Sequence, residues 1–360
     1  MELTPKQTYA AELLSEALTG SGLARDRAVL KIQESIGTTD LPVQLSPALT
    51  SIFMTGFDEV ETTWDKYAGK LVVDDFESND YYTFEWDDAD IPSKKDGREF
   101  YTDGLAPVGE FGEYPVIRFS ASGLKLSTAK RGVQIGFSWE ALRRNGKINL
   151  LKSALTQFGS RSKKTENLEA ANQLVTAAGV NTKNFKTNVD GNPELNMHTV
   201  EAALKQLFNS TNAKGRRLRT PSSYNLIVPS SLYGQAQGIF TAREIQRTDP
   251  VTGDIITMGN PVAGRIANIV EVPEIQDIAG ANANKAWFLI PTKGPAENNS
   301  IVNVFLSGHE SPKVFVKRDT NADPEEGSYE NDSYATKVRH VVKGGFIPNV
   351  ATLYSDGSGS

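Results

Sequence analysis

The segment from residue 78 to residue 120 constrains the fold of this chain most. Tyr81-Tyr82-Thr83-Phe84-Glu85-Trp86 is aromatic and β-prone, and Pro115-Val116-Ile117-Arg118-Phe119-Ser120 also has strand character. Residues 88–98 between them are polar and include a proline and a glycine, which suits the tip of a hairpin. A hairpin this polar cannot bury a core of its own. We therefore expect it to lie on another surface, and we favour that of a neighbouring molecule.

Charge is distributed unevenly around this hairpin. Residues 58–113 contain 17 acidic and five basic side chains, a net charge of −12. Residues 114–167 contain 11 basic and two acidic side chains, a net charge of +9, and residues 319–332 are acidic again. Blocks of opposite sign fit a protein that recognises copies of itself through complementary surfaces. Solvated loops whose individual charges contribute little are the alternative, and charge alone leaves both interpretations open.

Composition excludes most site chemistry. The 360 residues include no cysteine and only three histidines, which are far apart and not in metal-binding spacing. The chain has no phosphate-binding glycine loop and no nucleophile elbow. Asp87, Asp88 and Asp90 could attract a divalent cation, but they lack the glycine and terminal glutamate of a calcium loop. We expect no catalytic residue, no cofactor and no metal, and we expect His340, in a predicted strand, to pack or to form hydrogen bonds.

Targeting and membrane signals are also missing from the sequence. The first residues have no basic region followed by an apolar one, so we do not expect a secretory signal. The longest apolar runs, such as residues 286–290, are far shorter than the roughly 20 residues of a membrane span. The net charge of −6 argues against a general nucleic-acid binder. We expect a protein made in a cytosol-like compartment.

Helical signals dominate the first half outside the hairpin. Periodicity predicts short helices over residues 8–18, 25–35 and 48–57, and Ser138 is a candidate N-cap for a short helix over 139–144. A long helix is predicted over about 149–178, with Gly179 as its terminating residue. We expect its basic middle to be exposed and to meet acidic partners, although contact with nucleic acid remains the open alternative; this middle comprises Arg161, Ser162, Lys163 and Lys164.

The second half has the pattern of a mixed α/β region. An amphipathic helix is predicted over residues 197–208, and a second helix runs from Ser230 or Ser231 to about residue 240. Buried or alternating strands are predicted over 223–229, 266–272, 286–290, 301–306, 313–317 and 334–342. The whole chain is therefore expected to be α+β.

Three stretches carry a resemblance to a known family. They are Arg131-Gly132-Val133-Gln134-Ile135-Gly136-Phe137-Ser138-Trp139-Glu140-Ala141-Leu142, Tyr224-Asn225-Leu226-Ile227-Val228-Pro229-Ser230-Ser231-Leu232 and Lys337-Val338-Arg339-His340-Val341-Val342-Lys343-Gly344-Gly345-Phe346. The first precedes the long helix, the second is a strand–proline–helix step, and the third is a closing strand. With the arm, the hairpin and the helix in this order, the chain resembles the major capsid proteins of tailed bacteriophages, which have the HK97-like fold.

The resemblance implies an organisation for the whole chain. It comprises an N-terminal arm (1–56), a connection into the peripheral domain (57–74), an extended hairpin called the E-loop (75–120), a peripheral domain with a long spine helix (121–195), an axial α/β domain (196–312), and returning strands with a flexible tail (313–360).

The function implied is the construction of a shell rather than catalysis. The chain would assemble as hexamers and pentamers into an icosahedral shell around double-stranded DNA, which it would contact non-specifically. It would reside in the virion after assembly in the host cytoplasm, with scaffolding, portal and decoration proteins as further partners and no membrane. The shell of an encapsulin nanocompartment is the alternative, and an unrecognised α/β enzyme is a distant one.

Contacts between subunits follow from the charge blocks combined with the resemblance. In the family the E-loop lies across a neighbouring subunit, so acids of residues 74–113 would pair with bases among residues 118–164 of an adjacent copy. The candidate contact residues are Asp87, Asp88, Asp90, Lys94, Lys95, Arg98, Glu110, Glu113, Arg143, Arg144, Lys147, Arg161, Lys163 and Lys164. Some family members join an E-loop lysine to a neighbour's asparagine. Lys94, Lys95 and Asn331 are placed for this, but no acid occurs between residues 333 and 355 to assist, so we do not expect the crosslink.

Overall fold

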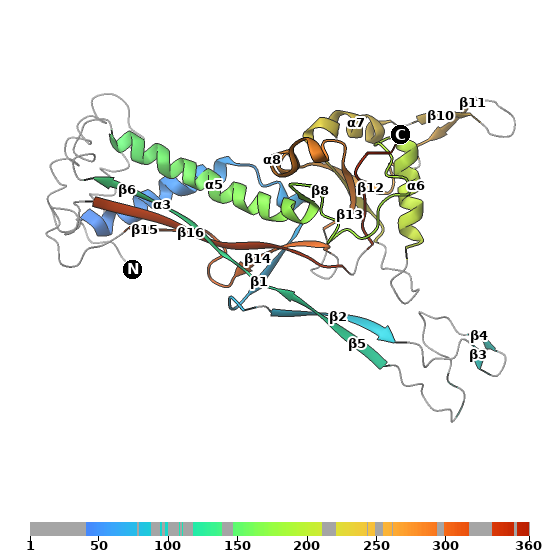
Figure 1. Ribbon diagram of the computed structural model, residues 1–360, viewed down its shortest axis with the longest axis horizontal. Helices are drawn as coiled ribbons and strands as arrows, with labels where there is room; N and C mark the ends of the chain where they lie inside the picture. The colour runs from blue at the N-terminus through green and yellow to red at the C-terminus, as the bar shows by residue number, and fades with distance from the viewer. Residues whose placement is uncertain are drawn as a thin grey trace. The chain divides into compact units, whose positions relative to one another are not determined.

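The computed structural model forms two compact units, which are residues 1–76 with 128–360, and residues 77–127 (Figure 1). It describes residues 41–77, 79–87, 94–95, 98–99, 108, 110, 118–138, 147–210, 221–242, 244–248, 255–260, 262–293, 299–316, 333–348 and 351–359. The helices predicted over 8–18, 25–35 and 139–144 lie outside these ranges.

The smaller unit is built on the predicted hairpin. Strand β2 (Asn79–Asp87) pairs antiparallel with β5 (Arg118–Leu126), from Asn79 opposite Leu126 to Asp87 opposite Arg118. The two-residue strands β3 (Lys94–Lys95) and β4 (Arg98–Glu99) pair with each other. The hairpin prediction is confirmed, but the returning strand continues six residues beyond Ser120. Strand β5 ends at Leu126 and a separate strand, β6, begins at Lys130.

The larger unit contains a five-stranded sheet with the long strand β16 (Ser333–Phe346) at its centre. Antiparallel to β16 lie β6 (Lys130–Ser138), β14 (Ile301–Leu306) and β15 (Lys313–Val316), and β1 (Gly69–Val73) lies parallel to β14. A β16 of 14 residues is long enough to pair with β6 and β15 along its first part and with β14 along its last part. We call this the β16 sheet.

One face of the β16 sheet is covered by the long helix α5 (Lys147–Leu174), as Figure 1 shows. Its 28 residues span about 42 Å. The long helix is confirmed, but it ends earlier than predicted. The β-branched Val175 and Thr176 form β7 (Val175–Thr176), which pairs with β8 (Gly179–Val180). Gly179, with φ of +122°, therefore serves this tight turn and does not end the helix.

Helix α3 (Leu41–Glu59) packs against α5. It is longer than the predicted 48–57: Pro42 lies in its first turn, where no intrahelical N–H is needed, and the helix also includes Pro47. The two helices approach closely at paired glycines. A methyl group on Gly56 would lie 2.0 Å from the carbonyl oxygen of Thr156, and one on Gly159 would lie 2.1 Å from that of Phe53. The sequence permits this crossing because neither position has a side chain.

A second sheet forms the α/β region of the larger unit. Its strand order is β12 (Ile266–Glu271), β9 (Tyr224–Val228), β13 (Trp287–Pro291) and β17 (Leu353–Ser355). Strands β9 and β12 are parallel, whereas β13 is antiparallel to both of its neighbours. The other elements of this region are α7 (Ser230–Thr241), α8 (Glu274–Ala279), the 3-10 helices η1 (Trp64–Lys66) and η3 (Gly280–Ala283), and the hairpin β10 (Glu244–Thr248) with β11 (Ile255–Gly259).

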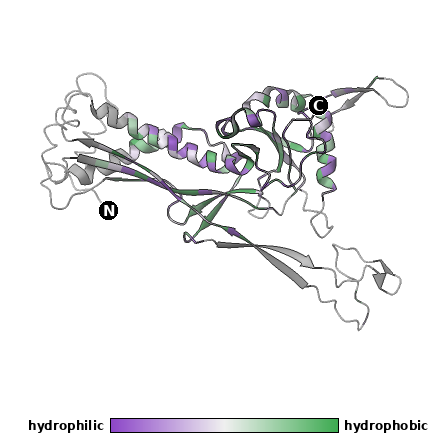
Figure 2. Ribbon diagram, viewed as in Figure 1, coloured by the Kyte–Doolittle hydropathy of each residue, from purple (hydrophilic) through white to green (hydrophobic). Residues whose placement is uncertain are grey.

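Helix α6 (Met197–Phe208) has the predicted bounds, because strong local signals specify it. The Asn196 side chain accepts a hydrogen bond from the Thr199 backbone N–H, and the Thr199 hydroxyl accepts one from the Asn196 N–H, which forms a capping box. Its apolar face is buried, while Figure 2 shows hydrophilic residues on the rest of the helix. Leu204 and Leu207 pack in one core with Trp287 of β13.

A second core joins α5 to both sheets. It includes Leu174 of α5, Val342 of β16 and Phe288 of β13. Phe185 lies among them, with its ring centroid 5.3 Å from that of Phe288 and 5.2 Å from that of Phe346. Burying aromatic rings in contact with one another contributes strongly to stability. The β16 sheet and the α/β region thus share one hydrophobic interior.

Candidate assembly surfaces

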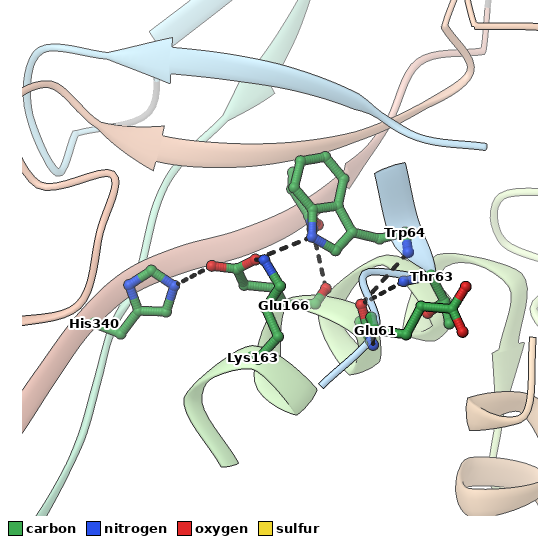
Figure 3. A network of polar contacts seen from close by, with 8 residues as sticks. Glu61, Thr63, Trp64, Lys163, Glu166 and His340 are labelled. Atoms are coloured by element: carbon green, nitrogen blue, oxygen red, sulfur yellow. Dashed lines mark hydrogen bonds and ion pairs between the residues drawn. The ribbon is translucent and has the colours of Figure 1, made fainter. Parts of the chain in front are cut away.

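A buried polar network lies between α5 and the β16 sheet, with Glu166 at its centre (Figure 3). The Glu166 side chain is almost wholly buried. Its Oε1 lies 2.9 Å from Nε2 of His340 on β16, and its Oε2 accepts a hydrogen bond of 3.0 Å from the Trp64 indole. Lys163 Nζ lies 3.4 Å from the same Oε2. A buried carboxylate requires such partners, so Glu166 fixes three separate segments to one another.

His340 is confirmed as a packing and hydrogen-bonding residue. Its ring makes an edge contact with Phe57 of α3, with centroids 6.4 Å apart, and lies 6.0 Å from the ring of Phe305. The Lys163 ammonium lies 4.5 Å from the Phe57 centroid, which adds a cation–π contact. The imidazole therefore occupies a closed aromatic pocket, where it is only 2% exposed. This environment suits a structural role.

Two more side chains of α5 fasten neighbouring segments. Asn167 Oδ1 accepts hydrogen bonds from the backbone N–H groups of Thr63 (3.1 Å) and Trp64 (3.4 Å), and its Nδ2 donates to the Glu61 carbonyl (3.1 Å). Glu169 forms an ion pair with Arg131 of β6 and accepts a 3.2 Å hydrogen bond from the Gly344 N–H of β16. The covered face of the sheet is thus held by hydrogen bonds as well as by apolar packing.

Two buried tyrosines of the larger unit are held in the neutral form. Burial raises the pKa of Tyr67 well above its ordinary value, and the nearby charge of Glu274 raises it further. Burial also raises the pKa of Tyr224. A phenol that resists ionisation is a poor general base or nucleophile. Within the described residues, no group of three histidine, cysteine or acidic side chains could hold a metal ion.

The opposite face of the β16 sheet is cationic where β15 pairs with β16. Residues directly opposite each other in an antiparallel pair share a face, and so do residues two apart in one strand. The register therefore places Lys313 opposite Arg339 and Phe315 opposite Lys337 on a single face. Arg339 Cζ lies 4.7 Å and Lys337 Nζ lies 5.4 Å from the centroid of the Phe315 ring. We call Lys313, Lys337, Arg339 and Phe315 the cationic face.

The candidate contact residues of α5 differ from one another in exposure. Arg161 is exposed, as predicted. The Lys163 side chain is only 15% exposed because it is used inside the subunit, and Ser162 is also buried, so the expectation that this whole stretch is exposed is wrong. Lys164 is half-exposed and forms a 2.7 Å ion pair with Asp277 of α8. A contact with another copy would have to compete with that internal pair.

The remaining described candidates lie in the smaller unit or at the start of α5. Asp87 ends β2, Lys94 and Lys95 form β3, Arg98 begins β4 and Lys147 begins α5. Glu110 lies in a turn. The other candidates, Asp88, Asp90, Glu113, Arg143 and Arg144, lie outside the described residues.

Sequence reasoning missed the network and the cationic face. Glu166 counts in the sequence as one acid in a basic stretch, and nothing local shows that it faces His340, 174 residues away. Lys337 and Arg339 are two residues apart in a predicted strand, so their side chains lie on one face, and this spacing could have predicted a basic face. The pairing of Lys313 with Arg339 depends on strand register, which the sequence does not reveal.

Comparison with known proteins defines the class. A family model described as phage capsid protein matches residues 123–354, which is more than half of the chain, so the chain belongs to the phage capsid protein family. It is accordingly a structural protein of the virion that assembles into a shell. The prediction of a phage capsid protein is confirmed, and the mixture of helices and sheets agrees with the predicted α+β class. No curated protein matches the chain.

Solved shell proteins are similar to this chain at low sequence identity. The virus-like particle from Pyrococcus furiosus is 13% identical, with a TM-score of 0.43 over 86% of this chain and 99% of that one. The capsid of Helicobacter pylori bacteriophage KHP30 is 7% identical, with a TM-score of 0.47 over 82% and 91% of the two chains. The SrpI encapsulin of Synechococcus elongatus is 8% identical, with a TM-score of 0.43 over 80% of this chain and 85% of that one.

Within the described ranges, no helix combines the length and apolar character of a membrane span.

Proposed function

We propose that this major capsid protein assembles as hexamers and pentamers into an icosahedral shell that encloses double-stranded DNA, and that assembly takes place in the host cytoplasm. The family match over residues 123–354 carries the proposal. The chain has no catalytic role in this proposal, because the polar groups of its core hold segments together. A shell needs many repeated weak contacts, so that errors reverse before the particle closes.

Electron microscopy tests this function. Purified protein in negative stain should show closed shells with six-fold capsomers, and particles from the source should contain nuclease-protected DNA. Small soluble oligomers at all concentrations would contradict the proposal. Shells that contain protein cargo and no DNA would instead support the encapsulin alternative, which shares the fold.

The charge blocks supply a contact between copies in this proposal. Acids of residues 74–113 pair with bases among residues 118–164 of an adjacent copy, and DNA meets the shell without sequence preference. A portal, a scaffolding protein and a decoration protein are further partners. Contacts of this kind depend on complementary potentials, so they should weaken as salt increases.

Charge reversal tests the contact. Changing Arg143, Arg144 and Lys147 together to glutamate should abolish particles while leaving a folded subunit, as judged by circular dichroism and size-exclusion chromatography. The matched control reverses Lys183, Lys186 and Lys205, three exposed lysines outside the proposed contact. Normal particles from the first triple variant would refute this contact but leave shell formation itself intact.

A further inference from the structure

Residues 351–359, which contain β17, are bonded to the α/β region on both sides. On one side β17 pairs antiparallel with β13. On the other side residues 188–193 run parallel to the segment and form two bridges with it. The N–H of Val189 donates a 2.7 Å hydrogen bond to the carbonyl of Tyr354. We call residues 351–359 the β17 segment, and the position between β13 and residues 188–193 that it occupies the β17 site.

The side chains of the β17 segment contribute to the two cores that meet at this sheet. Ala351 and Leu353 are fully buried in the core that contains Trp287. Tyr354 lies on the opposite side of the strand, where it packs against the other core with its ring centroid 6.1 Å from that of Phe185. Because apolar burial is the main stabilising contribution to a core, both cores are incomplete without this segment.

Polar contacts fix the register of the segment in its site. The Ser355 side chain is fully buried, and its hydroxyl donates a 2.7 Å hydrogen bond to the Pro193 carbonyl. The Trp287 indole donates to the same carbonyl at 3.1 Å. Further along, the N–H of Gly359 donates to the carbonyl of Asn192 at 2.8 Å. The β17 site therefore recognises both the backbone and particular side chains of the segment.

Two glycines of the segment fit the site sterically. Gly357 has φ of +69°, and a methyl group there would lie 2.5 Å from the Lys285 carbonyl oxygen. A methyl group on Gly359 would lie 1.9 Å from the carbonyl oxygen of Gly191. Both positions therefore require a residue without a Cβ. A tail rich in glycine and serine is usually flexible, but that expectation is wrong for residues 355–359, which are held in one place.

All partners of the β17 segment precede it in the chain. Among the described strands, β9 and β17 are the two neighbours of β13, so without the segment one edge of β13 is open. The side chains of β13 are all buried in the complete subunit, and they would lose part of their cover. An open edge with apolar side chains favours incorrect association. The α/β region is thus incomplete until residues 351–359 have been made.

We propose that the β17 site is a peptide-binding site that takes residues 353–359 by strand addition after the rest of the subunit has folded, and that only subunits with this site filled enter a shell. The ligand is an extended strand with leucine, serine and two glycines at fixed positions. The segment of the same copy is the occupant, because only residues 347–350 separate it from β16, and this short connection gives it a high effective concentration. The inference rests on the proposed function and adds a control over which copies assemble.

Two valines in the segment test the site. Gly357→Val combined with Gly359→Val removes the steric fit. The matched control is Gly234→Val combined with Gly238→Val in α7, where a methyl group at either position meets no atom within 4 Å. The first variant should lower the yield of shells at least tenfold, and the control should leave it unchanged. Normal yield from the first variant would overturn the inference, whereas absence of shells from the wild-type chain would refute the proposed function instead.

A synthetic peptide of residues 351–359 tests whether the site binds a strand. Added at about 1 mM to the Gly357→Val, Gly359→Val variant, it should restore at least half of the wild-type yield of shells, because the displaced segment leaves the site open. The same peptide with both valines should restore none. Equal effects of the two peptides would overturn the inference.

Refolding of the wild-type chain tests the order of events, and it does so even if the valine variant fails to fold. The N–H groups of Val189 and Gly359 donate across the site, so their protection in pulsed hydrogen exchange reports that it is filled. They should become protected after the amides of α5 and β16. Protection of these two amides before α5 and β16, or together with them, would overturn the inference.

Discussion

The two faces of the β16 sheet differ in how their charged side chains are neutralised. Under α5, the carboxylates of Glu166 and Glu169 are buried and each has partners, which include His340 and Arg131. On the cationic face, charges of one sign are gathered, and the described residues of its two strands include no acid. An unpaired charge is costly in a dry interior but tolerable in water. The covered face therefore holds the subunit together, and the open face is available to other molecules.

The largest expected effect comes from removing the centre of the covered face. Glu166→Ala should lower the free energy of unfolding by about 3–5 kcal/mol, because it strands the buried Lys163 and His340 groups. Guanidinium unfolding followed by tryptophan fluorescence measures this change, since Trp64 contacts Glu166. The control is Glu59→Ala on exposed Glu59, which should change the free energy by less than about 0.5 kcal/mol. Equal effects of the two substitutions would contradict the role of the network.

An intermediate effect is expected at the crossing of α3 and α5. Gly56→Ala should destabilise the subunit by about 1–3 kcal/mol, because its methyl group would overlap the Thr156 carbonyl. Gly238→Ala in α7 is the matched control, because a methyl group there meets no atom within 4 Å. That change should stabilise the subunit by about 0.5–1 kcal/mol through helix propensity. The close crossing would be refuted if the two variants had the same melting temperature.

The smallest effect on folding is expected on the cationic face. Lys337→Gln combined with Arg339→Gln should change the free energy of unfolding by less than about 0.5 kcal/mol, because both side chains lie at the surface. The same variant should alter how shell formation depends on salt, since it removes two charges of one sign from an open surface. Light scattering across a sodium chloride series measures this dependence. An unchanged salt profile would exclude the face from assembly.

The sequence predicted an element well where the residues that determine its bounds all lie within that element. Helix α6 has the predicted bounds because its cap and its apolar face both lie between residues 196 and 208. Strand β14 was predicted with the same success, since Ile301–Leu306 is a continuous buried apolar run. The end of α5 was misplaced because helix and strand signals overlap there, and Val175 and Thr176 joined the turn at Gly179.

The candidate surfaces were harder to predict because they depend on register and on distant pairing. Glu166 meets Trp64 and His340 only after α5 has packed on β16. The charge blocks led to a prediction of contacts between copies, which stays a prediction, and they did not show that Lys163 serves the interior. Composition shows which charges are available, but their exposure depends on the fold.

Hydrogen exchange on free subunits and on assembled shells tests the division between the two faces most directly. The β6 amides that point away from β16 should exchange rapidly in the free subunit and become protected in the shell, whereas those bonded to β16 should be protected in both. Amides of α5 near Glu166 should be protected in both states, because the network is complete within one subunit. The division would be contradicted if the β6 amides that point away from β16 exchanged equally fast in both states, or if the α5 amides gained their protection only on assembly.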